Sequence, residues 1–127
     1  MEAFLHAVAA EFAIHEPAAA RNVANQLKDI AGRPATFNPG AGTRIAPLAQ
    51  TLASPVAHPL IPQLAPIARD LNWSTGENFP MPACFKGRFA YCEIAGPEGM
   101  IPAQGFRFGT YIQHPDTWYV CVRPPPP

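Results

Sequence analysis

Residues 111–119, YIQHPDTWY, are the most informative stretch of this chain. Aromatic and β-branched residues are typical of strands, and His-Pro-Asp in the middle is typical of a turn. The stretch therefore predicts the end of one strand, a turn and the beginning of another. Residues 120–123, VCVR, lead into four prolines, which lack the N–H donors that a strand needs.

Working outward from this stretch, the sequence predicts two strands upstream, at 88–95 and 106–113. Both are rich in aromatic and β-branched residues. Between them, residues 96–99 read GPEG, and such a cluster of glycine and proline predicts a turn that joins the strands.

The first half of the chain has the apolar spacing of helices. The pattern predicts helices over 3–15, 18–31, about 47–53 and 58–71, with Pro66 as a kink inside the last. Residues 33–47, rich in proline and glycine, are expected to connect them. Helices come first and strands second, which predicts an α+β fold and not an alternating α/β one.

Composition excludes several classes of function. The 127 residues carry no formal net charge, so the chain has no basic surface field for nucleic acid or anionic lipid. No apolar run approaches the ~20 residues of a membrane span, and the first residues lack the basic region of a signal peptide. The three cysteines show no CxxC spacing and are interpreted as reduced thiols, which favours a cytoplasmic protein.

No complete catalytic or metal motif is visible in the sequence. His114 and Asp116 flank a proline and are interpreted as turn residues, because two ligands do not make a metal site. Glu93 could pair with Glu98, but Glu98 lies in the predicted turn. Cys92 is interpreted as a small buried side chain on a strand. The other histidines are interpreted as surface or helix-start residues: His6, His15 and His58.

Three segments together resemble the cupin-type dimethylsulfoniopropionate (DMSP) lyases. They are the apolar segment 58–73 with its Leu-Asn-Trp ending, the segment 91–99 and the segment 109–119. The resemblance implies an N-terminal helical region over 1–75 and the first strands of a cupin jelly-roll barrel over 76–119, which is incomplete. Residues 120–127 are then an aberrant or disordered proline tail.

The resemblance also implies a reaction. Such enzymes cleave DMSP to dimethyl sulfide and acrylate by β-elimination, assisted by a divalent transition metal such as Zn, Fe, Mn or Ni. In the family, a histidine-rich metal motif follows a tyrosine that corresponds to Tyr119. Here no histidine follows Tyr119. Tyr119 is therefore the one candidate catalytic residue that the resemblance places. It could line the substrate pocket or act in proton transfer, and the alternative is a strand aromatic packed in the barrel. The chain is expected to bind no metal and to be an inactive fragment.

Two hypotheses explain the proline tail. Four CCA codons read one base later encode histidines, so the tail could be a frame-shifted histidine cluster, and the DNA sequence decides this. Alternatively, the tail is simply a short disordered segment. For the whole chain, the alternatives to a lyase are a non-catalytic cupin-like binding module, which could form homo-oligomers through open sheet edges, and another metal-dependent cupin enzyme.

Overall fold

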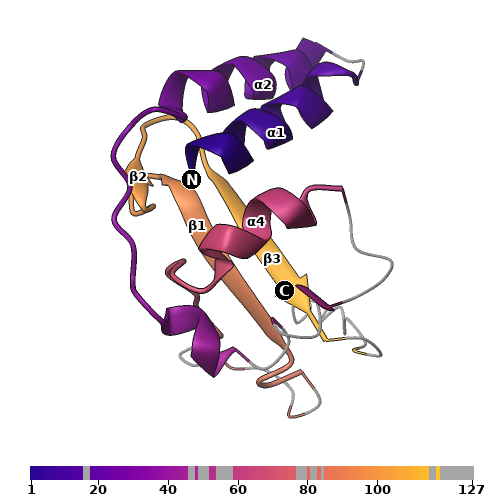
Figure 1. Ribbon diagram of the computed structural model, residues 1–127, viewed down its shortest axis with the longest axis vertical. Helices are drawn as coiled ribbons and strands as arrows, with labels where there is room; N and C mark the ends of the chain where they lie inside the picture. The colour runs from indigo at the N-terminus through magenta and orange to yellow at the C-terminus, as the bar shows by residue number, and fades with distance from the viewer. Residues whose placement is uncertain are drawn as a thin grey trace, which may run out of the picture.

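The computed structural model describes residues 1–15, 18–45, 48, 52–53, 59–76, 80, 83, 85–114 and 117. Helices come first and a sheet of three strands follows, so the predicted α+β class is confirmed (Figure 1). The open sheet agrees with an incomplete barrel, whereas its closure into a cupin jelly roll stays a prediction. Within the described ranges, no helix has the length and apolar character that crossing a lipid bilayer requires.

The first two helices confirm the predicted segments almost to their ends. Helix α1 spans Glu2–Ala13 and helix α2 spans Ala18–Ile30. In α1, the buried residues recur at the spacing of one helical face: Phe4, Leu5, Val8 and Ala9. In α2, Ala24, Leu27 and Ile30 do the same. The two helices pack side by side above the sheet (Figure 1).

The next two elements differ from the predicted ones. The predicted connection contains a 3-10 helix, η1, at Ala41–Arg44, and helix α4 is limited to Ile61–Ala68. Proline in the first turn of α4 is favourable, and Pro66 is accommodated inside it. The helix does not reach residue 71 because the chain turns at 69–70. There the Arg69 carbonyl accepts a hydrogen bond from Gly42 of η1, and the Asp70 carbonyl accepts one from Asn38 in the loop before η1. The predicted helix over 47–53 lies largely outside the described residues.

The sheet has the strand order β2-β1-β3. Strand β1 spans Phe89–Gly96 and pairs antiparallel with β3, which spans Phe108–Gln113. Both agree with the strands predicted from the sequence, apart from their ends. The register places Phe89 opposite Gln113, and an irregularity interrupts the pairing between Glu93 and Ala95.

The predicted direct turn between β1 and β3 is wrong. A two-residue strand, β2 at Ile101–Pro102, lies between them and pairs parallel with Ala95 and Gly96. Residues 96–99 do turn, but residues 101–102 then lie beside the end of β1 and run in the same direction as β1. The amide of Ala103 donates to the Gly96 carbonyl at 2.9 Å. So short a strand carries no periodic signal, and its Pro102 argues against a strand.

The helices cover one face of the sheet and make one core with it. From β1 this core takes Ala90, Cys92 and Ile94, and from β3 it takes Ile112. The ring of Phe4 on α1 lies 6.4 Å from that of Phe108 on β3. Because strand residues alternate in direction, the intervening side chains lie on the opposite face, which no described helix covers.

Candidate functional site

On the uncovered side of the β1–β3 pair, aromatic and charged side chains lie close together. Strand alternation and the observed register place six residues there: Phe89, Tyr91, Glu93, Gly109, Tyr111 and Gln113. We call this surface the open face. In the register, Tyr91 lies directly opposite Tyr111, and Glu93 lies opposite Gly109, so the carboxylate has a position without a side chain across from it.

Aromatic rings stack along the open face. The rings of Phe85 and Phe89 are 4.6 Å apart between centroids and almost parallel. Phe89 in turn lies 6.4 Å from Tyr91 and 5.9 Å from Tyr111, again with near-parallel planes. Tyr111 remains 48% exposed, and its hydroxyl donates to Gln113 Oε1 at 2.8 Å. The face therefore presents aromatic π-surfaces, which attract cations.

A charged pair lies beside these rings. Arg107 Nη1 is 3.3 Å from Glu93 Oε2, with the arginine side chain 68% and the glutamate side chain 28% exposed. Solvent screens such a pair, so it contributes at most about 1 kcal/mol to stability. The other oxygen, Oε1, is buried against Gly96 and has no hydrogen-bond partner among the described residues.

Together these side chains border an open groove of about 270 Å³. Tyr91 and Tyr111 contribute aromatic surface to it, and Glu93 and Arg107 contribute one charge of each sign. A cation near the rings and Glu93, and an anion near Arg107, would both find complementary surroundings. The groove therefore suits a small molecule that carries both charges.

Cys92 lies on β1 between Tyr91 and Glu93, but its side chain belongs to the core. Burial raises the pKa of its thiol to about 11. A backbone hydrogen bond from Asn72 acts against this rise, and the negative charge of Glu93 adds to it. The thiol is 3.5 Å from the sulfur of Met100. A neutral, buried thiol is a poor nucleophile, so the interpretation of Cys92 as a packing residue agrees with its position.

His114 has a more specific environment than a solvated turn provides. Arg88 Nη2 lies 2.9 Å from His114 Nδ1, and Arg88 Nε donates to Thr117 Oγ1 at 2.9 Å. The His114 amide also donates to the Arg88 carbonyl at 2.7 Å. A guanidinium can only donate, so Nδ1 is the acceptor and the neutral ring carries its proton on Nε2. These bonds tie the end of β3 to the start of β1.

The remaining sequence-based candidates do not come together. Tyr119, the predicted catalytic residue, lies outside the described residues, as do Asp116 and His58. His6 and His15 belong to the α1 end of the molecule, whereas His114 follows β3 at the other end (Figure 1). In the described ranges, no three side chains of His, Cys, Asp or Glu are grouped closely enough to hold a metal ion. These residues therefore do not fit the metal that the resemblance implies.

Sequence reasoning missed the groove because it depends on strand register. Alternation along β1 places Tyr91 and Glu93 on one face, but only the pairing with β3 adds Tyr111 to them. Arg107 lies before β3, where no sequence pattern predicts its contact with Glu93.

Comparison with known proteins agrees with the resemblance seen in the sequence. The family model of dimethylsulfoniopropionate lyase matches residues 19–121, which include α2 apart from its first residue, η1, α4 and the three described strands. No curated protein and no solved structure matched the chain. The family match covers most of the 127 residues. The chain therefore belongs to the dimethylsulfoniopropionate lyase family.

Proposed function

We propose that this chain binds DMSP on the open face and that its family reaction is the cleavage of DMSP to dimethyl sulfide and acrylate. The observation that carries the proposal is the family match together with a groove that offers both charges beside aromatic rings. DMSP is a zwitterion with a carboxylate at one end and a sulfonium at the other. Its two charges complement Arg107 and Glu93.

Binding would exchange one ion pair for two. The Glu93–Arg107 contact is partly exposed and weak, so a zwitterion can separate the two side chains at small cost. The sulfonium would then lie between the Glu93 carboxylate and the rings of Tyr91 and Tyr111, an attraction of about 0.5–2 kcal/mol per ring contact. The substrate carboxylate would accept hydrogen bonds from the Arg107 guanidinium.

The reaction itself is a β-elimination. A base takes the proton α to the carboxylate, the electron pair forms the carbon–carbon double bond, and the carbon–sulfur bond breaks as dimethyl sulfide leaves with its electron pair. We assign proton transfer to Tyr119 by resemblance. A tyrosine with an ordinary pKa near ~10 needs a neighbouring cation to act as a base at neutral pH. In the family, the resemblance implies a divalent metal as Lewis acid.

We further propose that the 127-residue chain binds DMSP without cleaving it. The chain has four histidines, of which three lie in the described ranges. His6 lies on α1, His15 follows α1, and His114 follows β3. No step through a metal can therefore be assigned to the described residues.

Both parts of the proposal can be tested with the same preparation. Chemical shifts in ¹H–¹⁵N spectra would be followed as DMSP is added, and headspace dimethyl sulfide would be measured with Zn²⁺, Fe²⁺, Mn²⁺ and Ni²⁺. We expect saturable shifts on β1 and β3. Tyr111→Leu and Arg107→Gln should each weaken binding about fivefold, which corresponds to about 1 kcal/mol. Arg33→Gln, an exposed arginine outside the groove, is the matched control.

The proposed binding of DMSP and the proposed absence of cleavage are contradicted by different results. Sustained dimethyl sulfide release with any of the metals would disprove the inactivity. Unchanged DMSP affinity in both groove variants would remove the binding surface from consideration. No dimethyl sulfide together with groove-dependent binding is the expected result.

A second candidate function is that of a non-catalytic binding module. It is favoured by the position of β3, which has no second neighbour among the described strands. An edge strand can pair with another copy of the chain or with a partner strand. We propose homo-oligomer formation through this edge.

A further inference from the structure

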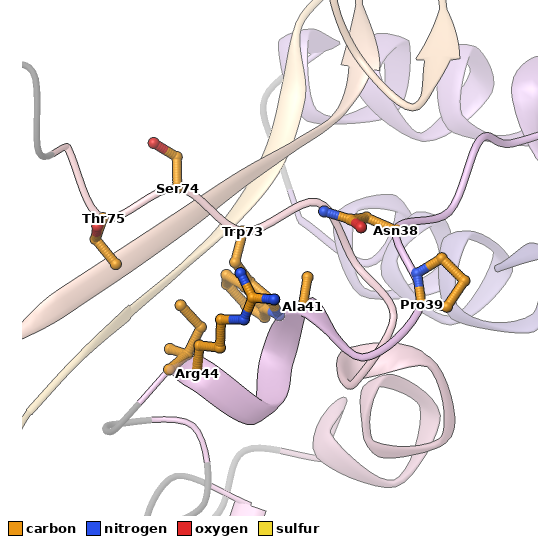
Figure 2. A pocket seen from close by; sticks show the side chains of 8 residues that line it. Asn38, Pro39, Ala41, Arg44, Trp73, Ser74 and Thr75 are labelled. Carbon is orange, nitrogen blue, oxygen red and sulfur yellow. The ribbon is translucent and has the colours of Figure 1, made fainter.

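A second cavity lies away from the open face, at the junction of η1 with the segment that follows α4. It has a volume of about 350 Å³, in the range of pockets for small ligands. One wall comes from Asn38 and from Arg44 with Ile45, and the other comes from Trp73 and Thr75 (Figure 2). These two stretches are about thirty residues apart in the sequence.

The walls of this cavity are fixed by backbone hydrogen bonds. The amides of Asn38 and Gly42 donate to the carbonyls of Asp70 and Arg69 at 2.9 and 2.8 Å. The amide of Gly40 donates to Asp70 Oδ1 at 2.9 Å. The cavity is therefore held open by its surroundings and needs little ordering when a ligand binds.

The opposite wall is anchored in the same way. Trp73 Nε1 donates to the Ala68 carbonyl at 2.7 Å, which fixes the indole at the end of α4. Ser74 exchanges two backbone hydrogen bonds with Tyr91 of β1, at 2.8 and 2.9 Å. Because the indole N–H is already bonded to Ala68, the ring of Trp73 is the apolar surface that this segment contributes to the cavity.

The chemistry of the cavity is that of an anion site. Among the described residues that line it, Arg44 is the one charged residue and none is acidic. Among the described residues the Arg44 guanidinium has no carboxylate partner. In Figure 2 its guanidinium is directed toward Trp73, and the Asn38 amide extends toward the same space. The Asp70 carboxylate, which helps to hold the loop before η1, accepts a hydrogen bond from the Gly40 amide.

From these contacts we infer that the cavity between η1 and residues 73–75 binds a small organic oxyanion. The guanidinium of Arg44 and the amide of Asn38 hold the oxygen atoms, and the body of the ligand lies against Trp73 and Ile45. Arginine suits carboxylate and phosphate because its planar fork donates two parallel hydrogen bonds. The site is independent of the open face and of the reaction proposed for it.

Trp73 provides a direct probe of the site. The chain has two tryptophans, so Trp118→Phe leaves the Trp73 indole N–H as the single indole signal in a ¹H–¹⁵N spectrum. In this background, sodium benzoate, acetate and inorganic phosphate would be titrated at constant ionic strength, with sodium chloride as the reference. Benzoate combines a carboxylate with a ring, acetate carries the carboxylate alone, and phosphate replaces the carboxylate.

We expect benzoate to shift the Trp73 signal saturably and to bind at least threefold more tightly than acetate. Arg44→Gln should weaken benzoate binding at least tenfold, and Arg44→Lys should weaken it less. Arg33→Gln, at an exposed position outside the cavity, should leave it unchanged. Arg44 is exposed, so these variants should fold, which circular dichroism verifies. Phosphate binding tighter than benzoate, with the same dependence on Arg44, would identify the oxyanion as a phosphate.

Two results would overturn the inference. One is a Trp73 shift that chloride reproduces at the same ionic strength. The other is an unchanged benzoate affinity in Arg44→Gln.

Discussion

At the scale of single residues, Cys92 couples the stability of the fold to pH. Its thiol is 2% exposed, and burial raises its pKa to about 11 from the ordinary value of 9.0. The folded chain therefore keeps the thiol proton at pH values where the unfolded chain has lost it. Below pH 9 both states are neutral at this position, so the contribution to stability is fully present there.

As pH rises from 9 to 11, this contribution should be lost. A pKa difference of about 2 corresponds to about 3 kcal/mol in the free energy of unfolding. Urea unfolding at pH 7.5, 9, 10 and 11, in the presence of a reductant, would measure it. Cys92→Ala is the control, because tyrosine and lysine titrations are common to both proteins. A gap between the two proteins that stays constant with pH would contradict the burial of Cys92.

At the scale of elements, the β1–β3 pair depends on Gly109. A methyl group at this position would collide with the backbone carbonyl oxygen of Cys92 on the neighbouring strand. The Cys92 carbonyl belongs to the backbone and cannot change its position by a side-chain rotation. Strands β1 and β3 would therefore have to separate locally. Gly109→Ala should therefore destabilise the fold by about 1–3 kcal/mol.

Gly32 provides the matched substitution. An added methyl there meets no atom within 4 Å, and the backbone is outside the set of positive-φ glycines. Gly32→Ala should leave the free energy of unfolding unchanged or slightly increased. Thermal melts of both variants would decide the matter, and equal melting temperatures would contradict the close strand approach at Gly109.

The elements also show what a sequence can and cannot predict. The spacing of Phe4, Leu5 and Val8 follows from helix geometry, so α1 could be predicted almost to its ends. Strand β2 could not, because two residues are too few for a period. The hydrogen bond from the Gly42 amide to the Arg69 carbonyl fixes one wall of the cavity that Arg44 lines. It depends on tertiary packing, which local sequence patterns do not encode.

At the scale of the whole molecule, the edge of β3 predicts self-association. In the described part of the sheet, β3 pairs with β1 alone, and Tyr111 on it is about half exposed. Size-exclusion chromatography with light scattering, over a range of protein concentrations, should show a mass that rises with concentration. Tyr111→Lys places a charge on the edge strand and should reduce the association.

The matched control is Ile14→Lys, because Ile14 is an exposed apolar residue on the α1 side of the molecule. It should leave the association intact. A monomeric mass at every concentration would argue against the oligomer. Equal effects of both substitutions would show that the association does not depend on β3.

At this scale the family and the α+β class could be predicted from the sequence, since residues 58–73, 91–99 and 109–119 carry the resemblance. The groove could not, because Glu93, Arg107 and Tyr111 meet only through the register of two strands. The role of Tyr119 and the metal of the family stay predictions.

The shared core has a practical consequence for anyone who cuts this chain. Leu64, Ala68 and Leu71 from the helical half pack in the same cluster as Ala90, Cys92 and Ile94 from the sheet. The change from helices to strands suggests residue 75 as a place to divide the chain by cloning or proteolysis. Such a cut would separate two halves whose apolar surfaces cover each other and exclude water. We expect each piece alone to be less stable than the whole chain, because it would expose the core residues that the other piece covers.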